Sequence, residues 1–371
     1  MKVRVECDAL ADAVQWTAKT LPKGPAGRGG LLLDADSEHI KISSFDLDLS
    51  SEASLGSQVE EPGRALVSGR LLADIARNLP AAPVSLETDG GRCELRCGRA
   101  RFMLPMLPED DYPPLPSLPP EAGALPGSDF AQAVAQTYIA ASKADTLPHF
   151  TGIRLEAEED TLTLAATDRY RLAVRELNWS PAVVGFSRAI NVPGRALSDV
   201  AKSFGATSTV QLALEPDEHG ERTLGIVGDD RRFTTRLLDP QFPKFRDLLP
   251  EQFASSVRAD VAELSEAIKR VALVAERNMP VRLDIRDGEI ELRVGNPDET
   301  QAQESVEAQL EGSPMVIAFN PTYLLDGLHA LGTPTAVIRY NESVRPAVIV
   351  GAGEDAEPSL DFRYLLMPVK I

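Results

Sequence analysis

The chain has 371 residues and a formal net charge of −18, and hydrophobic residues make up 43% of it, which is enough to build the cores of two or three domains. The excess of acid argues against a surface that binds nucleic acid all over. A run of 18 apolar residues does not occur, and the charged start M-K-V-R-V-E-C-D is unlike a secretory leader, so we expect neither a membrane span nor a signal peptide.

The first third of the chain predicts a helix, a strand pair, a second helix and further strands. Residues Ala9–Leu21 place apolar side chains at helical spacing. From Gly30 an alternating pattern, G-L-L-L-D-A-D-S-E-H-I-K-I-S-S, predicts a hairpin around an acidic turn. Val67–Leu79, V-S-G-R-L-L-A-D-I-A-R-N-L, predicts the second helix, and R-F-M-L-P from Arg101 predicts a closing strand.

Three cysteines are too few for a disulfide framework. Cys93 and Cys97 are four residues apart in a predicted strand, which puts their Cα atoms roughly 13 Å apart, too far for a bridge. The sequence therefore predicts buried free thiols.

The middle third repeats this order. The proline-rich stretch Pro113–Pro126 predicts a linker without ladder pairing. Asp129–Ala144 predicts a helix that Ser128 caps, and a strand pair follows from Gly152. Val192–Phe204, V-P-G-R-A-L-S-D-V-A-K-S-F, predicts the second helix, and R-F-T-T from Arg232 closes the unit.

The last third repeats it again after a short linker, Pro240–Pro250. Val261–Arg277 predicts a helix with Asp260 as its cap. The strand pair from Val281 contains Asp287-Gly288, a strong hairpin signal. F-N-P-T-Y-L-L-D-G-L-H-A-L then predicts the second helix, from Phe319 to Leu331, and F-R-Y-L-L-M-P-V-K-I ends the chain.

The three second helices share a row of side chains on one face and lie at offsets of 125 and 127 residues. Their members are Arg70, Asp74 and Arg77, then Arg195, Asp199 and Lys202, then Thr322, Asp326 and His329. A period near 125 residues is too long for a solenoid, whose units have roughly 20–45 residues. It indicates three α+β domains, each with two helices backed by antiparallel sheets, over residues 1–121, 122–251 and 252–371.

The sequence contains no recognisable catalytic motif. The acidic clusters (Asp34, Asp36, Glu38 and Glu156, Glu158, Glu159, Asp160) allow a metal-dependent hydrolase as a remote alternative, but the repeat places both in hairpin turns. The four histidines lack ligand spacing to one another or to cysteine. We therefore predict no catalytic residue, no metal and no cofactor.

Four stretches in this order resemble the DNA polymerase III beta subunit family, the beta sliding clamps: A-T-D-R-Y-R-L-A-V-R-E-L from Ala166, F-P-K-F-R-D-L-L-P from Phe242, F-N-P-T-Y-L-L-D-G-L from Phe319 and the terminal Y-L-L-M-P-V-K-I. The resemblance covers the whole chain. It implies the DNA-clamp fold and a head-to-tail homodimer whose six domains close into a ring around duplex DNA. It also implies a non-catalytic processivity factor, in the cytoplasm and on the nucleoid during replication, whose partners are the DNA polymerase III alpha subunit, the clamp loader and other clamp-binding-motif proteins.

Under this resemblance the helix pairs line the pore, the acidic charge lies outside, and DNA contact is independent of sequence. The exposed helix faces are expected to carry Gln15, Gln136, Arg270 and His329 besides the basic residues. The basic residues expected to face DNA are Lys19, Lys23, Arg28, Arg70, Arg77, Lys143, Arg195, Lys202, Lys269 and Arg277. Lys23 and Arg28 belong to a 21–30 loop that differs from the family's usual longer segment. Because each row also contains an aspartate, we expect the lining to attract DNA only weakly and to let it slide.

The resemblance further implies a peptide-binding pocket between the second and third domains. Its residues are expected to be Phe150, Thr167, Arg169, Arg171, Leu172, Pro243, Leu248, Leu365, Leu366, Met367, Pro368 and Val369. Phe150 is bulkier than the aliphatic residue usual in the family, and Asp247 replaces a basic or polar one. A specialised clamp paralogue that tolerates a pocket-binding inhibitor is therefore an alternative.

For the dimer contact, the resemblance pairs Phe102 and Leu104 of one chain with Leu273 and Val274 of the other.

Overall fold

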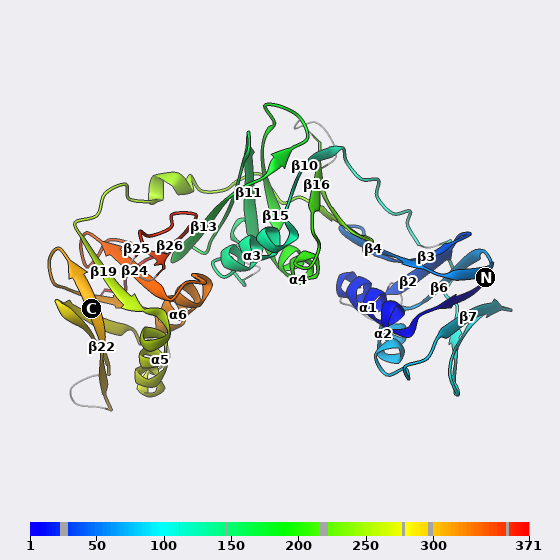
Figure 1. The fold of residues 1–371 in the computed structure, drawn as a ribbon, viewed down its shortest axis with the longest axis horizontal. Helices are drawn as coiled ribbons and strands as arrows, with labels where there is room; N and C mark the ends of the chain where they lie inside the picture. Colours follow the sequence, from blue (N-terminus) through cyan, green and yellow to red (C-terminus); the bar gives the residue numbers. More distant parts are fainter. Residues whose placement is uncertain are drawn as a thin grey trace.

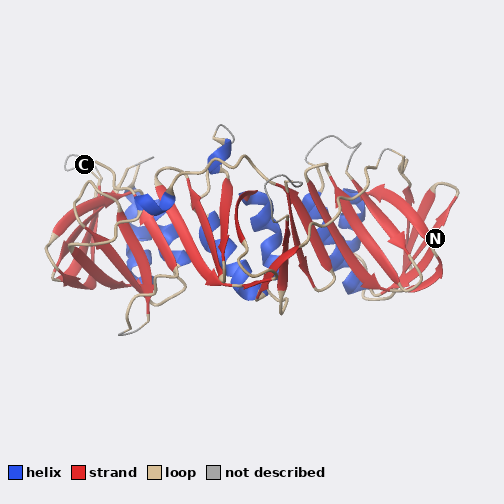
Figure 2. Ribbon diagram, turned by 90° about the horizontal axis from the view of Figure 1, so that it is seen from above, coloured by secondary structure: helices blue, strands red, loops and turns tan. Residues whose placement is uncertain are grey.

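The computed structural model describes residues 1–22, 29–110, 112–144, 147–215, 222–276, 279–295, 300–353 and 356–370. Three units lie side by side along a crescent, with the first unit at one tip and the third at the other (Figure 1). Helices occupy the concave side, and a continuous row of strands backs them (Figure 2). The three α+β units predicted from the repeat are confirmed.

The first unit opens with β1 and α1, continues with the β2–β6 strands and α2, and closes with a β7–β8–β9 meander. Its elements are β1 (Lys2–Val5), α1 (Cys7–Thr17), the 3₁₀ turn η1 (Ala18–Thr20), β2 (Gly30–Ala35), β3 (His39–Phe45), β4 (Leu49–Gly56), β5 (Gln58–Glu61), β6 (Gly63–Ser68), α2 (Gly69–Arg77), β7 (Val84–Asp89), β8 (Arg92–Cys97) and β9 (Ala100–Pro105).

The second unit repeats this plan. Its elements are β10 (Glu121–Leu125), α3 (Gly127–Tyr138), η2 (Pro148–Phe150), β11 (Gly152–Glu158), β12 (Thr161–Thr167), β13 (Arg171–Asn178), β14 (Ser180–Pro181), β15 (Ser187–Pro193), α4 (Gly194–Phe204), β16 (Val210–Leu214), β17 (Thr223–Gly228) and β18 (Arg231–Arg236).

The third unit follows a linker that contains a short 3₁₀ helix. The elements are η3 (Phe245–Leu248), β19 (Ser255–Asp260), α5 (Val261–Val271), η4 (Ala272–Val274), β20 (Val281–Arg286), β21 (Gly288–Val294), β22 (Ala302–Glu311), β23 (Met315–Phe319), α6 (Pro321–Ala330), β24 (Thr335–Tyr340), β25 (Ala347–Ala352) and β26 (Phe362–Leu366).

Sheets run across both junctions between units. The closing strand of the second unit, β18, pairs antiparallel with β4 of the first and sets Phe233 opposite Ser51. The closing strand of the third unit, β26, pairs with β13 of the second and sets Tyr364 opposite Ala173. Each junction therefore joins a closing strand to the third strand of a meander (β2–β3–β4 or β11–β12–β13).

The helix that carries the repeated row in the second unit is α4. Leu197, Val200, Ala201 and Phe204 are buried on one side of it, as their spacing predicts. Gly127, the first residue of α3, lies so close to α4 that an added Cβ would be 2.2 Å from the Phe204 carbonyl oxygen. This glycine lets the two helices of the unit pack closely.

Several predicted helix boundaries are corrected, since α1 spans Cys7–Thr17 instead of Ala9–Leu21 and α5 ends at Val271 instead of Arg277. α3 begins at Gly127 and ends at Tyr138, well before Ala144, and its N-cap is Pro126. The Ser128 hydroxyl does not cap it, because it donates instead to the Asp129 carboxylate at 3.1 Å. The Asp260 cap of α5 is confirmed, since its carboxylate accepts from the Glu263 N–H at 2.8 Å.

The prediction that Pro113–Pro126 lacks ladder pairing is wrong for its last part. Residues Glu121–Leu125 form β10, which pairs with β16. This segment contains no proline, so its N–H groups remain free to join a sheet.

All three cysteines are free and buried, as predicted. Burial raises the pKa of the Cys93 thiol to about 11. No helix among the described residues is long and apolar enough to span a membrane.

Candidate functional site

Basic side chains lie on the helices of the concave side, on the turn η1 and in the loop after α3. Those that are exposed are Lys19, Arg70, Arg77, Lys143, Arg195, Lys202 and Lys269. Three further members of the predicted set, Lys23, Arg28 and Arg277, lie outside the described residues. All of the exposed members except Lys143 belong to helices or to the 3₁₀ turn η1, and the labelled helices lie on the concave side of the crescent (Figure 1).

Acidic neighbours reduce the positive charge of this surface. Arg195 lies 4.0 Å from Asp199, and Lys269 lies 2.8 Å from Glu266. Such exposed pairs contribute little to stability, but each carboxylate lowers the local positive potential. This arrangement fits a surface that attracts phosphates weakly.

Lys19 also joins the first unit to the second. Its ammonium donates to the Asp199 carbonyl oxygen at 3.3 Å and to the Ser203 hydroxyl at 3.1 Å, both on α4. Burial, followed by the charge of Arg231, lowers the pKa of Lys19.

Gln136 differs from its prediction as an exposed lining residue. It is buried, and its amide donates to the Ala330 carbonyl oxygen at 2.7 Å, from α3 to α6. Gln136 therefore holds the second and third units together. Arg270, also expected on the helix face, forms a bidentate contact with Glu304 on β22.

The predicted pocket residues gather at the outer side of the junction between the second and third units. Leu172 on β13 lies directly opposite Leu365 on β26. Thr167, Leu172, Leu365 and Leu366 are buried. Leu172 and Leu365 belong to one buried cluster with Phe245, whereas Leu366, the next residue on β26, points to the opposite face of the sheet and into the main core.

Past β26, the tail of the chain remains at the surface. Met367 and Val369 are each 37% exposed. The Met367 N–H donates to the Tyr170 carbonyl oxygen at 2.9 Å, so the tail follows the loop between β12 and β13.

Two tyrosines that the sequence reasoning missed belong to this site. Tyr170 is 56% exposed, and its ring lies 6.5 Å from the ring of Tyr323 on α6. Both lie inside the motifs that carried the family resemblance, so aromatic residues within those motifs were the available signal.

The linker before the third unit forms another wall. Phe245 is buried against Leu172 and Leu365, and Phe242 and Leu249 pack on the same cluster. Leu248 and Asp247, by contrast, are exposed, Leu248 by 50%. Pro243 precedes them and lines a shallow recess with Phe242 and Phe245.

Arg171 lies beneath the pocket and is only 5% exposed. Its guanidinium contacts Asp168 at 3.0 Å and Asp326 of α6 at 2.6 Å, and it stacks 4.1 Å from the centre of the Tyr323 ring. Burial alone would lower the pKa of Arg171, but the Tyr364 hydroxyl and the two carboxylates outweigh it and raise that pKa. Arg171 therefore links the loop between β12 and β13 to α6.

Phe150 and Arg169 stand at the rim of the pocket. The Arg169 guanidinium carbon lies 6.0 Å from the centre of the Phe150 ring. Phe150 is half-buried, whereas Arg169 is exposed.

The four predicted dimer residues lie at opposite tips of the crescent. Phe102 on β9 is half-buried and Leu104 is buried, both in the first unit. In the third unit, Leu273 is 85% exposed and Val274 half-buried. One chain therefore does not bring the two pairs together.

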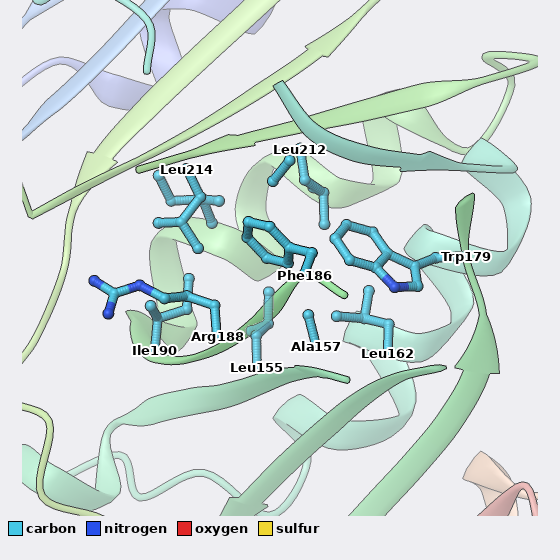
Figure 3. A pocket seen from close by; sticks show the side chains of 11 residues that line it. Leu155, Ala157, Leu162, Trp179, Phe186, Arg188, Ile190, Leu212 and Leu214 are labelled. Atoms are coloured by element: carbon cyan, nitrogen blue, oxygen red, sulfur yellow. The ribbon is translucent and has the colours of Figure 1, made fainter. Parts of the chain in front are cut away.

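A crevice inside the second unit offers no catalytic chemistry. Trp179, Phe186 and Ile190 are among its apolar lining, and its volume of about 20 Å³ is near that of one water (Figure 3). Its lining contains no histidine, cysteine or carboxylate.

The acidic clusters, which were predicted to be turns, belong partly to strands: Asp34 lies in β2 and pairs with Arg64, and Glu156 lies in β11 and pairs with Arg154. The Asp36 carboxylate accepts from the N–H groups of Glu38 and His39, both at 2.9 Å, and these bonds lower the pKa of Asp36. Among the described residues, no group of three or more histidine, cysteine or acidic side chains is placed to hold a metal ion.

Three consecutive domain families match the chain. These are the DNA polymerase III beta subunit N-terminal domain over residues 1–116, its central domain over 124–244 and its C-terminal domain over 246–370. The beta sliding clamp of Streptomyces coelicolor is 48% identical over 100% of both chains. The beta sliding clamp homolog GriR of Streptomyces muensis is 40% identical over 100% of this chain and 99% of its own.

Solved structures agree. A sliding clamp (DNA polymerase III subunit beta) from Pseudomonas aeruginosa, bound to griselimycin, superposes with a TM-score of 0.90 at 25% identity and 100% coverage of both chains. The DNA polymerase sliding clamp from Bacillus subtilis gives a TM-score of 0.89 at 26% identity, over 100% of this chain and 99% of that one.

Proposed function

Because this chain belongs to the DNA polymerase III beta subunit family, and is thus a non-catalytic sliding clamp of the polymerase holoenzyme, we propose that two copies close head to tail around duplex DNA, and that an outer pocket tethers the polymerase. The observation that carries this proposal is the repeated strand pairing between units, which leaves one matching strand with an open edge at each tip of the crescent, among the described strands.

One tip of the crescent ends in a closing strand and the other in the third strand of a meander, and these are the two kinds of strand that pair at the junctions between units. At one tip, the closing strand β9 pairs only with β8 among the described strands. At the other, β22 is the third strand of the meander β20–β21–β22. It pairs with β19 only from Ala308 to Glu311, so the edge of residues 302–307 is open among the described strands. Open edges invite pairing with another chain.

The repeat also gives the register of the closed ring. Phe102 corresponds to Phe233 and Tyr364, and Ala302 corresponds to Ser51 and Ala173. Phe102 of one protomer therefore faces Ala302 of its partner. Phe233 and Tyr364 are fully buried at their junctions, whereas Phe102 is only half-buried in one chain, which is what an uncovered junction leaves.

Leu273 fits the same scheme. Leu273 lies six residues after the buried Ala267. Lys19 lies six residues after Ala13 and Ile139 six residues after Ala133, so the three side chains occupy equivalent positions in the repeat. Lys19 reaches α4 of the next unit, and Ile139 lines a recess with Asp326 and His329 of α6. In the ring, Leu273 accordingly packs on α2 of the partner.

Closed in this way, the ring encloses DNA with the helices facing the duplex. The basic residues of the concave side attract phosphates, and their acidic neighbours keep that attraction weak. Topology, and not affinity, then retains the DNA, and the clamp slides without reading sequence.

Retention on DNA tests this proposal. We expect clamps loaded by the clamp loader onto nicked circular DNA to stay bound through gel filtration at 0.5 M salt, and to be lost after the circle is cut once. The physical reason is that salt screens phosphate contacts but does not open a ring. Equal loss from circular and linear DNA would contradict the topological mechanism.

For the outer pocket, we propose binding of short peptides from the polymerase alpha subunit, the clamp loader and other clamp-binding-motif proteins. Exposed Leu248, Tyr170 and Met367 surround an apolar floor, and such a patch on a monomer's surface marks an interaction site. Methionine adapts to varied ligands. We also propose that the clamp works in the cytoplasm, on the nucleoid during replication.

Substitution at Leu248 tests the pocket. The Leu248→Glu variant is expected to bind a labelled peptide from the alpha subunit at least about 30-fold more weakly in fluorescence anisotropy, as for a hot-spot residue. Val184→Glu, which changes a fully exposed valine in the second unit, is the matched control. Unchanged affinity of Leu248→Glu would place peptide binding elsewhere.

The alternative of an inhibitor-tolerant paralogue is less well supported. Phe150 and Asp247 motivate it, but the chain is more similar to the Streptomyces coelicolor clamp than to the homolog GriR. The remote alternative of a metal-dependent hydrolase is weakened, because Asp36 is engaged by its own turn and Asp34 and Glu156 each pair with an arginine.

A further inference from the structure

A recess lies between α3 of the second unit and α6 of the third, two helices of the concave side (Figure 1). Its volume is about 370 Å³, and Gln132, Ile139, Asp326 and His329 are among the residues that line it. Gln132 and His329 are exposed and Ile139 is half-buried. The recess is therefore open to small molecules from solvent.

At the first junction, the side chain of Lys19 occupies the equivalent place. Lys19 and Ile139 hold one position of the repeat, and Asp199 and Asp326 hold another. The Lys19 ammonium donates to the Asp199 carbonyl oxygen at 3.3 Å and to the Ser203 hydroxyl at 3.1 Å. An ammonium group thus lies between the helices of the first junction, and isoleucine does not supply one at the second.

The charges next to the recess favour a cation. The carboxylates of Asp168 and Asp326 both contact the single guanidinium of Arg171, so this cluster of three retains one negative charge. Asp326 lines the recess, and its side chain is 37% exposed. The last turn of α6 adds the negative end of a helix dipole.

Gln136 adds an acceptor that lacks a donor. Its amide nitrogen donates to the Ala330 carbonyl oxygen at 2.7 Å, which fixes the orientation of the amide. Its side-chain oxygen is buried and has no hydrogen-bond partner among the described residues. An unpaired buried acceptor costs free energy. Because Gln136 lines the recess, a ligand with several N–H donors would relieve this cost.

From these observations we propose that the recess binds a primary ammonium group carried on a linear aliphatic chain, the chemistry that Lys19 supplies at the first junction. The ammonium has three donors, which serve Asp326 and the Gln136 oxygen. Its alkyl chain packs on Ile139 and Ala135. The bound amine joins α3 to α6 as Lys19 joins η1 to α4. The site lies within one chain, so it depends on neither the ring nor the peptide pocket.

Titration with n-butylamine, which has the length of a lysine side chain, tests this proposal. In the dimeric protein with ¹³C-labelled alanine methyl groups, the signals of Ala135 and Ala330 report on the recess. We expect them to shift saturably with a Kd on the order of 1 mM, as for a ligand of few atoms. n-Butanol, which has no charge, should bind about tenfold more weakly.

Two reciprocal variants test whether Lys19 is the correct model for the ligand. Ile139→Lys supplies the ammonium from the chain itself and should bind butylamine at least about tenfold more weakly. Ile139→Met, neutral and of similar volume, is the matched control and should bind within about threefold of the unmodified protein. Lys19→Ala removes the ammonium at the first junction, and the methyl signal that this variant gains should also shift with butylamine.

The absence of a saturable shift in the unmodified protein overturns the inference. Equal binding of butanol, or undiminished butylamine binding by Ile139→Lys, also overturns it, because the recess would then select for apolar shape alone. If Ile139→Lys does not fold, Lys19→Ala provides the test. A gained methyl signal that butylamine leaves unmoved would show that the repeat does not define an ammonium site.

Discussion

The Leu273→Glu variant is expected to sediment as a monomer at about 1 µM, where the unmodified protein sediments as a dimer. Leu273 is 85% exposed in the single chain. A head-to-tail dimer closed by rotation has two identical interfaces, so one substitution acts twice. Truncating an interface hot spot costs at least about 2 kcal/mol, and a buried, unpaired carboxylate adds to that cost.

Val184→Glu is the matched control for this experiment. Val184 is fully exposed on the loop between β14 and β15, away from both tips. It should leave the dimer intact. A dimeric Leu273→Glu protein, or a monomeric Val184→Glu protein, would contradict the placement of the interface.

Cross-linking tests the register independently. Residues directly opposite in an antiparallel pair have Cα atoms about 4.5–5.5 Å apart, within the range of a disulfide. The double variant Phe102→Cys with Ala302→Cys should therefore form a covalent dimer on mild oxidation. Moving the second cysteine one place, to Gln303→Cys, turns its side chain to the other face and should abolish the bond.

The repeat made most of the fold predictable. Apolar spacing within Val192–Phe204 identified the buried face of α4, and the recurring row identified its two counterparts. Helix ends were less predictable, because tertiary contacts decide them. Gly127 starts α3 where close packing against Phe204 requires a glycine, and no local signal at Ser128 could reveal this.

Side-chain partners across unit junctions were the least predictable feature. Gln136 occupies a helix position that periodicity assigns to the surface, yet α6 of the next unit covers it. Arg171 was expected in the pocket by resemblance. Its carboxylate partner Asp326 lies 155 residues later in the chain, and only the folded junction shows that the pair lies beneath the pocket.

The two junctions have the same strand pairing but differ in the side-chain contacts that hold them together. Between the first and second units, Arg231 pairs with Asp12, and the rings of Trp16 and Phe204 meet at 6.2 Å. The position equivalent to Arg171 is Leu49 there. The buried arginine is thus found at the second of these two junctions and not at the first, and we expect it to hold the loop between β12 and β13 as well as the junction.

Replacing this arginine is expected to loosen both sides of the second junction. In the Arg171→Met variant, hydrogen exchange should show amide protection about 100-fold lower in the 168–172 loop and in α6. Removing one partner of a buried ion pair costs about 3–5 kcal/mol, and the low end applies because Asp326 is 37% exposed and can be solvated. Protection of α1 and α4, at the other junction, should not change.

Arg175→Met provides the control on the same strand. Arg175 also faces a carboxylate across this junction, but Asp361 is 69% exposed and 3.9 Å away, so its pair contributes little. Protection in that variant should match the unmodified protein within about threefold. If Arg171→Met loosened the loop but not α6, Arg171 would be an element of the loop alone. If it loosened both, as we expect, the 168–172 loop and α6 depend on the same arginine, and a peptide that ordered this loop would also stabilise α6.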